Sequence, residues 1–360
     1  MKHIATIAGL GLLAACASAT PSTGGAGAPG TGVTPAPSVP ANSEARTTTP
    51  AAAAATITAG EMRDHIAYIA SDALRGRDTP SPGLDSAAAY LVREFQRLGL
   101  RGGAENGAFI QRYPLRPKGN LAPNVVAIFP GSDPTLRNEY VVLSAHMDHV
   151  GVGRPVRGDS IYNGADDDAS GTSALLEVAE AFASLAEGVR PARSILFLAV
   201  SGEEKGLLGS EYYSDHPTVP LESIVANVNM DMIGRNETDG VVVIGKNYSS
   251  LGAVVEQVAA EHRQLIGLTA GDDRWPNERF FFRSDHFNFA RKEIPAIFFF
   301  AGTHEDYHEP SDEVERLDVD KAARVARMIF LTTHSIATTP QRPTWSAQGL
   351  AEVRRMTGGR

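Results

Sequence analysis

The 360-residue sequence has a single cysteine, Cys16, and contains no block of basic residues. One cysteine cannot form a disulfide within its own chain, so covalent cross-links contribute nothing to stability. The formal charge of -9, from 42 acidic and 33 basic residues, argues against nucleic acid as a partner. The sequence also lacks an internal repeat. Its hydrophobic residues, 42% of the total, are sufficient for a buried core.

Residues 1–16 have the form of an export signal. A basic start is followed by the apolar run Ile4–Leu13, which is too short to span a bilayer. Leu13-Ala14-Ala15-Cys16 resembles the bacterial lipobox, in which the signal is cut before the cysteine and the cysteine then carries lipid. We therefore expect membrane contact only through a lipid anchor at Cys16.

The alternative for this segment is an ordinary secretory signal, and either interpretation exports the chain. Ala17 and Ser18 do not match the aspartate that retains many lipoproteins in the inner membrane. We therefore expect a cell-envelope protein, either an outer-membrane lipoprotein facing the periplasm or a secreted protein.

The rest of the chain divides by composition. Residues 17–56 are rich in Ala, Thr, Pro and Gly and have almost no large apolar side chain, which predicts a flexible tether. Residues 57–337 are expected to form a single folded domain. Residues 338–360 are polar with Pro and Gly, which predicts a loosely held tail.

Apolar periodicity within residues 57–337 alternates between helical and strand patterns. The runs Ser194–Val200 and Ala296–Phe300 are continuously apolar, which is typical of strands covered on both faces. The pattern predicts an α/β fold with three layers, α/β/α, around a mixed, largely parallel central sheet. Helices are expected at 58–69, 87–98, 169–185, 207–213, 250–263 and 319–336, and strands at 109–113, 124–129, 139–145, 194–200, 224–230, 241–244 and 296–300.

An unusual acidic run occupies Asn163–Gly171, shortly after Ser144–Asp148. Three consecutive carboxylates repel one another, so they require either solvent or a cation. Alone, the run would fit an exposed turn. However, His146 ends a predicted strand and Asp167 lies at a predicted helix entrance, where open α/β sheets place their ligands.

Other polar residues also follow apolar strands. Glu203 and Glu204 come after one strand, Asp231 directly follows another, and His308 lies beyond a third. Each has an ordinary explanation: acids in a helix's first turn, a partner for a buried Arg, or a surface histidine. Because parallel strands bring their carboxyl ends to one edge, these residues should meet His146 there. Two histidines with several acids are the donors expected for zinc or a related divalent ion.

The number of donors favours two metals. His146 with Glu204 or Asp231 would complete one site, and His308 with another acid the second. One carboxylate of the acidic run would bridge two cations about 3.5–4 Å apart, so that they share a hydroxide. One of the paired glutamates then remains for proton transfer.

Six motifs in this order resemble the M28 family of zinc metallopeptidases, specifically its bacterial aminopeptidase group. The motifs are His146–Asp148, Gly164–Gly171, Gly202–Glu204, Asn229–Met232, Arg283–His286 and Tyr307–Asp312. The run Ala70–Arg77 also resembles bacterial members. Some members carry an inserted protease-associated domain, but residues 100–123 are too few for one.

The resemblance implies a specific set of zinc ligands. His146, Asp167 and Asp231 would bind one Zn²⁺, and Asp167, Glu204 and His308 the other, giving two Zn²⁺ per chain. It also implies a cis peptide between Asp167 and Asp168.

The resemblance further implies catalytic roles around these ligands. Glu203 would be the general acid/base, and Asp148 would orient His146. Tyr307 and Arg283 would hydrogen-bond the scissile carbonyl oxygen or the product carboxylate. Asp285 and His286 would support the site rather than bind metal.

The expected function is that of a zinc-dependent aminopeptidase, which hydrolyses the N-terminal peptide bond of peptides through a metal-bridging hydroxide and a glutamate base. Its partners would be peptides with a free N-terminus. The alternatives are a glutaminyl cyclase, for which one zinc suffices, a carboxypeptidase, and a non-catalytic binding module on the same scaffold. Arg274–Pro276 and Phe280–Phe282 would line an apolar substrate pocket or belong to the core.

Overall fold

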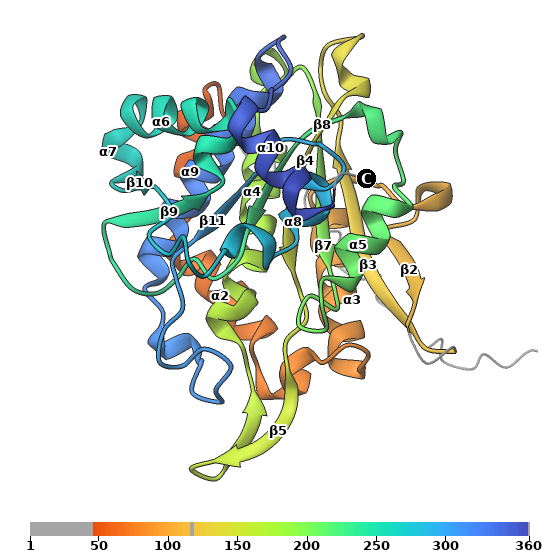
Figure 1. Cartoon of the computed structure of the whole chain (residues 1–360), viewed down its shortest axis with the longest axis vertical. Helices are drawn as coiled ribbons and strands as arrows, with labels where there is room; N and C mark the ends of the chain where they lie inside the picture. The colour runs from red at the N-terminus through yellow and green to blue at the C-terminus, as the bar shows by residue number, and fades with distance from the viewer. Residues whose placement is uncertain (1–45, 116–118, 359–360) are drawn as a thin grey trace, which may run out of the picture. The chain divides into compact units, whose positions relative to one another are not determined.

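A computed structural model describes residues 46–115 and 119–358. The expected signal peptide, Cys16 and the first part of the expected tether lie outside these residues. The described residues contain a nine-stranded sheet with helices on both sides (Figure 1). None of the helices in the described ranges has both the length and the apolar character needed to cross a membrane.

The sheet has a parallel centre and antiparallel margins. Its order is β1-β3-β7-β4-β8-β11-β9-β10, and β2 also pairs with β3. The central strands β7, β4, β8 and β11 are neighbours and run parallel to one another. At the two ends of this block, β3 runs antiparallel to β7, and β9 runs antiparallel to β11. The strands are β1 Arg101–Gly102, β2 Ile110–Pro114, β3 Leu121–Phe129, β4 Tyr140–His146, β7 Ser194–Val200, β8 Ile224–Met230, β9 Gly240–Ile244, β10 Thr269–Gly271 and β11 Ala296–Phe300.

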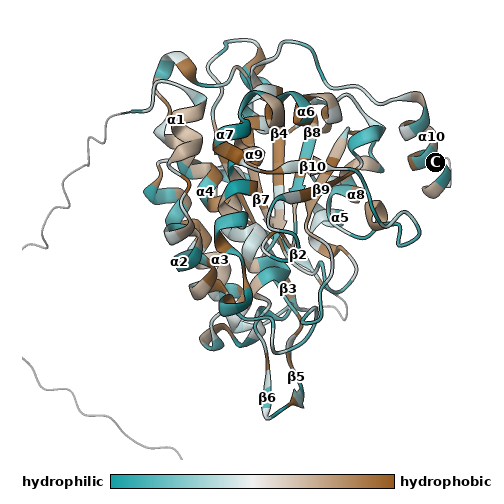
Figure 2. Cartoon of the chain, turned by 90° about the vertical axis from the view of Figure 1, so that its left-hand side faces the viewer, coloured by the Kyte–Doolittle hydropathy of each residue, from teal (hydrophilic) through white to brown (hydrophobic). Residues whose placement is uncertain are grey.

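Helices cover both faces, which confirms the expected α/β fold. Figure 2 shows α1 to α4 and α9 on one side of the sheet and α5, α8 and α10 on the other. The helices are α1 Pro50–Ala55, α2 Ala59–Ile69, α3 Pro82–Arg97, α4 Gly171–Ser184, α5 Leu208–Asp215, α6 Leu251–Glu261, α7 Arg263–Ile266, α8 His286–Ala290, α9 Val319–Thr338 and α10 Ala347–Met356.

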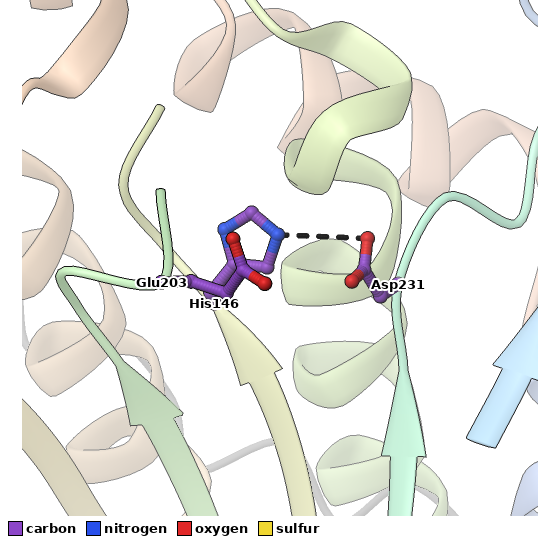
Figure 3. Close-up of side chains that lie close together, drawn as sticks. All are labelled: His146, Glu203 and Asp231. Atoms are coloured by element: carbon purple, nitrogen blue, oxygen red, sulfur yellow. Dashed lines mark ion pairs between the residues drawn. The ribbon is translucent and has the colours of Figure 1, made fainter. Parts of the chain in front are cut away.

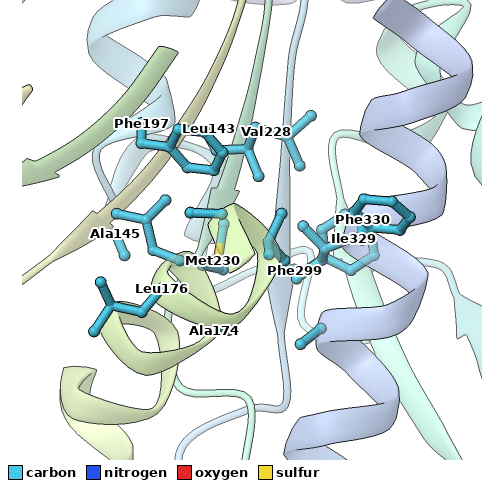
Figure 4. Packing of buried hydrophobic residues seen from close by; sticks show 14 of the residues in the cluster. Leu143, Ala145, Ala174, Leu176, Phe197, Val228, Met230, Phe299, Ile329 and Phe330 are labelled. Atoms are coloured by element: carbon cyan, nitrogen blue, oxygen red, sulfur yellow. The ribbon is translucent and has the colours of Figure 1, made fainter. Parts of the chain in front are cut away.

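Alternate residues of the central strands build two separate cores. On β7, Phe197 faces the α4 and α9 side, whereas Leu196 and Leu198 pack on the opposite side with Tyr213 of α5 and Phe289 of α8. Figure 4 shows the first core, where strand side chains meet α4 and α9. Because both faces are dry, β7 is buried along its whole length, which explains its continuously apolar sequence.

Capping fixes where the helices begin. The Thr58 hydroxyl accepts a hydrogen bond from the amide of Glu61 at 3.2 Å and donates to the Glu61 carboxylate at 2.7 Å, which starts α2. Ser81 caps α3, with Pro82 in its first turn, so this helix begins five residues before the expected start at 87.

A hairpin that the sequence pattern did not predict connects the two central motifs. Strands β5 Gly151–Val156 and β6 Asp159–Tyr162 pair with each other and extend away from the rest of the domain (Figure 1). Val152 and Val156 are exposed on β5. With both faces open to solvent, the hairpin shows no alternation of apolar and polar residues.

The expected tether ends earlier than predicted. Residues 46–56 were assigned to it, but Thr47 bridges to Leu185 and α1 begins at Pro50, capped by Thr49. Ala53 and Ala54 are fully buried. Alanine adds little apolar area, so composition suggested disorder, but it allows close packing of α1 against α4 and α9.

The expected loose tail is also wrong over the described residues. After α9, the chain forms α10, whose Val353 is buried with Trp345 beside it. The Trp345 indole donates to the carbonyl of Glu293 at 2.7 Å, and Arg354 pairs with the Glu293 carboxylate at 2.7 Å. These few anchors hold a segment that is polar in composition.

Candidate metal centre

The predicted ligands meet at the carboxyl ends of the parallel strands. His146 is the last residue of β4, Asp231 directly follows β8, and Glu203 and Glu204 lie just beyond β7. Figure 3 shows His146, Glu203 and Asp231 above the ends of their strands. Nε2 of His146 lies 3.2 Å from Oδ1 of Asp167 and 3.5 Å from Oδ1 of Asp231.

A second set of donor atoms lies near the other carboxylate oxygen of Asp167, Oδ2. Nε2 of His308 lies 3.1 Å from Oδ2 of Asp167 and 3.0 Å from Oε2 of Glu204. His308 comes from the loop after β11, so all four central parallel strands lead into the site. Asp167 therefore faces one histidine with each of its two carboxylate oxygens.

The donor spacings fit zinc. Bonds of about 2.0–2.1 Å to a tetrahedral ion separate its ligand atoms by roughly 3.3 Å. The four separations given above, from 3.0 to 3.5 Å, lie around this value. The donors are nitrogen and carboxylate oxygen, which zinc prefers. The residues present thus fit two ions bridged by Asp167.

The electrostatics of the site require positive charge. Burial favours the neutral form of Asp167, but hydrogen bonds from His146 and His308 hold its pKa well below its usual range. Burial opposes protonation of His308, yet its contacts with Asp167 and Glu204 raise its pKa to about 10. Without metal, the protonated imidazoles of His146 and His308 supply the positive charge beside Asp167. Metal binding would therefore release these protons.

The three acids of the run have different roles. Only Asp167 faces both histidines. Asp168 accepts hydrogen bonds from the amides of Gly171 at 2.9 Å and His146 at 3.1 Å, and Asp166 accepts one from the amide of Gly234 at 2.7 Å. The Asp167-Asp168 peptide is cis, as the resemblance implied. Two of the three carboxylates therefore hold the backbone around the third.

Asp148 links the first histidine to the glutamate pair. Its carboxylate lies 3.7 Å from Nδ1 of His146, accepts a hydrogen bond from Thr79 at 3.0 Å and accepts the amide of Glu203 at 3.3 Å. The closer contact to Nδ1 of His146 is the Asp148 backbone carbonyl, at 3.2 Å. Residue 148 thus directs Nε2 of His146 toward the donors.

Glu203 stands beside the first donor set. One of its carboxylate oxygens lies within 4.8 Å of donor atoms of His146 and Asp231. Burial, together with the negative Asp231, Asp285 and Glu204, raises the pKa of Glu203 well above its usual range, although His146 opposes the shift. Its carboxyl group can therefore hold a proton that an exposed glutamate would release.

A cleft opens onto the site, with His146, Asp167, Glu203 and Asp231 in its lining. Tyr307 and Arg283 both line it, with a floor that includes Phe280, Phe298 and Phe300. Burial and nearby carboxylates raise the pKa of Tyr307, so its hydroxyl stays protonated and can donate.

Arg283 lies at the exposed side of this cleft. It stacks over Phe280 at 4.8 Å and approaches Glu278 at 3.4 Å. Phe280 therefore lines the cleft as well as belonging to the core, whereas Trp275 packs behind it against Phe300. Of the two segments expected at the pocket, Phe280–Phe282 therefore contributes to the lining of the cleft, whereas Trp275 of Arg274–Pro276 packs behind it.

The neighbours of Arg283 support the site, and one of them, Ser284, also lines the cleft. The Ser284 hydroxyl donates to Oδ2 of Asp231 at 2.8 Å. Asp285 accepts a hydrogen bond from Ser210, and His286 is buried between Phe281 and Phe298, with ring centroids 4.9 Å from each.

Sequence reasoning missed Arg77, which organises the backbone beneath the donors. It is fully buried, and its guanidinium donates to four backbone carbonyls. Two of them, Asn163 at 2.6 Å and Gly164 at 3.1 Å, precede the acidic run, and Met147 at 3.0 Å follows His146. The signal was present, because Arg77 ends the run Ala70–Arg77.

A third histidine, His149, also lies among the donors. Its Nδ1 is 2.8 Å from Oε1 of Glu204. The sequence places it one residue after Asp148, but a single histidine there gives no indication that it points into the site.

Comparison with known proteins places this site in a family. The description "Peptidase family M28" matches residues 124–333, which include all five predicted ligands. The chain belongs to peptidase family M28.

Individual relatives of this M28 chain are distant. A protein of Arthroderma benhamiae named "Probable leucine aminopeptidase" is 26% identical over 223 residues, which are 60% of this chain and 58% of that protein. The chain thus matches less than two thirds of that relative's length.

Solved structures of low sequence identity share the fold. The LapA aminopeptidase of Legionella pneumophila matches with a TM-score of 0.63 at 20% identity, covering 81% of this chain and 75% of that one. A glutaminyl cyclase of Porphyromonas gingivalis matches with a TM-score of 0.60 at 18% identity, covering 76% and 97%. Both neighbours support the zinc-exopeptidase-like architecture.

Proposed function

We propose that this M28 member is a di-zinc aminopeptidase that removes the N-terminal residue of peptides. The observation that carries the proposal is the position of Asp167, whose two oxygens face separate sets of donors. Relatives named as aminopeptidases support the same activity.

Bound zinc would supply Lewis acidity and lower the pKa of water to about 7. His146, Asp167 and Asp231 would hold one ion, and Asp167, Glu204 and His308 the other. The remaining chemistry falls to the chain's own side chains.

Glu203 would move the proton. Its carboxylate stands beside the first donor set, and its backbone amide donates a hydrogen bond to the Asp148 carboxylate at 3.3 Å. It would take a proton from the attacking water and return it to the leaving amine. Because burial and its acidic neighbours favour its protonated form, it can hold the proton between these two steps.

Tyr307 would stabilise the negative charge that develops on the scissile carbonyl oxygen. Its protonated hydroxyl lines the cleft beside His146 and Asp231. Arg283, at the exposed side of the cleft, would hydrogen-bond the same oxygen or the product carboxylate. The apolar floor favours an apolar side chain on the cleaved residue.

The decisive assay uses purified protein and a panel of aminoacyl anilides, with chelator and then zinc add-back. An aminopeptidase cleaves free-amine substrates and not their N-acetylated forms, and its activity returns with zinc. Conversion of N-terminal glutamine to a cyclic product would instead indicate the glutaminyl cyclase, to which the fold is also similar. A protein that binds zinc without any turnover would support the binding module.

Two variants separate the proposed roles. Glu203→Ala should keep both zinc ions and lose most turnover, whereas Asp167→Ala should lose metal because it removes the shared ligand. Peptidase activity retained by Glu203→Ala would contradict the proton-transfer role.

We also propose export to the cell envelope with a lipid at Cys16, on the basis of the sequence alone. Labelling with a fatty-acid analogue should mark the wild type and not Cys16→Ser. Equal labelling of both would contradict the anchor.

A further inference from the structure

His149 is a buried residue of the site to which neither the family resemblance nor the proposed mechanism gives a role. It is fully buried, and neither ring nitrogen has a hydrogen-bond partner among the residues that the structure describes. A buried imidazole without any partner is costly, so its surroundings must contain something that satisfies it.

The nearest polar atoms are carboxylate oxygens of proposed zinc ligands. Nδ1 of His149 lies 2.8 Å from Oε1 of Glu204 and 3.8 Å from Oδ2 of Asp167. Neither contact is a hydrogen bond: the first lacks the alignment, and the second is too long. A nitrogen that faces two carboxylates without bonding to either is placed as a ligand would be around a shared cation.

His308 approaches the same two carboxylates. Its Nε2 is 3.1 Å from Oδ2 of Asp167 and 3.0 Å from Oε2 of Glu204. The rings of His149 and His308 lie edge to face, with centroids 5.6 Å apart and an interplanar angle of 69°. The separations from both imidazoles, 2.8 to 3.8 Å, bracket the roughly 3.3 Å expected between ligands of a tetrahedral zinc ion.

The backbone around His149 makes room for its ring in this position. Gly164 has φ +58°, and a Cβ there would lie 2.5 Å from Cγ and Cδ2 of the imidazole. The amide of His149 donates to the carbonyl of Arg77 at 3.4 Å, so the loop that carries the ring is tied to the scaffold under the site. Any residue but glycine at 164 would displace the ring.

From these contacts we infer that His149 is a further zinc ligand, supplying Nδ1 to the ion that Glu204 and His308 hold. The inference depends on the proposed di-zinc function. It gives the second site two imidazoles, Glu204 and the shared Asp167, whereas the first site has one imidazole. The second ion would therefore have one more neutral ligand, the His149 imidazole, than the family resemblance implies.

The test compares zinc binding by wild type, His149→Gln and the control His65→Gln. His65 is a partly buried histidine beside a glutamate, Glu177 at 3.5 Å, but it belongs to the helical layer. Metal-free proteins are titrated with zinc against a competing chelator, and their thermal unfolding is recorded without metal. Loss of an outer hydrogen bond weakens metal binding by about 10–100-fold, so loss of a ligand should exceed about 100-fold.

We expect two zinc ions in wild type and in His65→Gln, and more than about 100-fold weaker binding of one ion in His149→Gln. A smaller loss would overturn the inference. X-ray absorption on the two-zinc wild type provides a test that needs no variant: three imidazoles per two ions support His149, and two contradict it. A wild type that binds fewer than two zinc ions would contradict the proposed function itself.

Discussion

Replacement of Arg77 by alanine should destabilise the domain and weaken its hold on metal. The guanidinium donates to the carbonyls of Ile69, Met147, Asn163 and Gly164, at 2.6 to 3.1 Å. Burial lowers its pKa to about 10, against the opposing effect of Asp148 and other acids, so it remains charged at neutral pH. No other residue in the described ranges donates a side-chain hydrogen bond to these four oxygens.

The magnitude follows from the carbonyls left behind. The Gly164 carbonyl keeps a hydrogen bond from the amide of Ala169 at 3.2 Å, so three carbonyls are left without a partner. A buried acceptor without a partner costs at least about 1 kcal/mol, which gives a loss of about 3 kcal/mol in the free energy of unfolding. Arg77→Lys keeps the charge but cannot span all four oxygens with one ammonium, so a loss of about 2 kcal/mol is expected. Zinc affinity should fall at least about 10-fold, because Met147 and Gly164 adjoin ligand-bearing segments.

Urea unfolding of the metal-free proteins measures these losses. Arg97→Ala serves as the control, because Arg97 is half-exposed and pairs with Glu94 and Glu180 on the surface, where an ion pair contributes about 0–1 kcal/mol. If Arg77→Ala lost no more than Arg97→Ala, the proposed role of the guanidinium in holding the ligand loops would be refuted.

Three further predictions concern the cleft, the helical layer and the metal. Tyr307→Phe should lower kcat by about 10²–10³-fold with little change in KM, as expected for loss of one oxyanion donor, and a changed KM with normal kcat would contradict that role. Burial raises the pKa of Glu177 to about 8 from 4.5, so the unfolded state binds fewer protons between these values and stability should fall as pH rises from 5 to 8. Thermal melts should show a smaller fall for Glu177→Gln, and parallel melting curves would contradict the shift. Chelation should abolish turnover and lower the melting temperature, and zinc should restore both; unchanged activity after verified metal removal would argue against a metalloenzyme.

The sequence was most informative where strands are buried on both faces. The bounds of β7, β8 and β11 agree with the expected runs, because strands buried on both faces are mostly apolar along their length. The direction of β9, which is antiparallel to β11, could not be read from composition, since it depends on the connecting chain.

Segments held by few contacts were harder to predict. Helix α1 packs through alanines, α10 through Val353 and Trp345, and the β5–β6 hairpin through almost nothing apolar. In each, the local sequence resembles that of a loop, and for the two helices the stabilising partner lies far away in the chain.

At the site, the sequence predicted donors that follow strands, because strand direction alone brings them together. It did not predict Arg77 or His149. The run Ala70–Arg77 drew attention to Arg77, but the backbone carbonyls that Arg77 binds cannot be read from the sequence, and the position of His149 depends on the space left by Gly164. The sequence also did not predict that Asp166 and Asp168 accept hydrogen bonds from backbone amides while Asp167 faces the histidines.

The base of the projecting hairpin is fixed independently of its tip. A Cβ at Gly76 would lie 2.4 Å from the carbonyl oxygen of Tyr162 and 2.5 Å from that of Gly151, so the chain before Arg77 packs directly against the point where the ribbon leaves the domain. Lengthening, shortening or exchanging the tip should therefore leave the donor atoms in place. The hairpin is thus a natural place to attach a new binding segment close to the donor atoms.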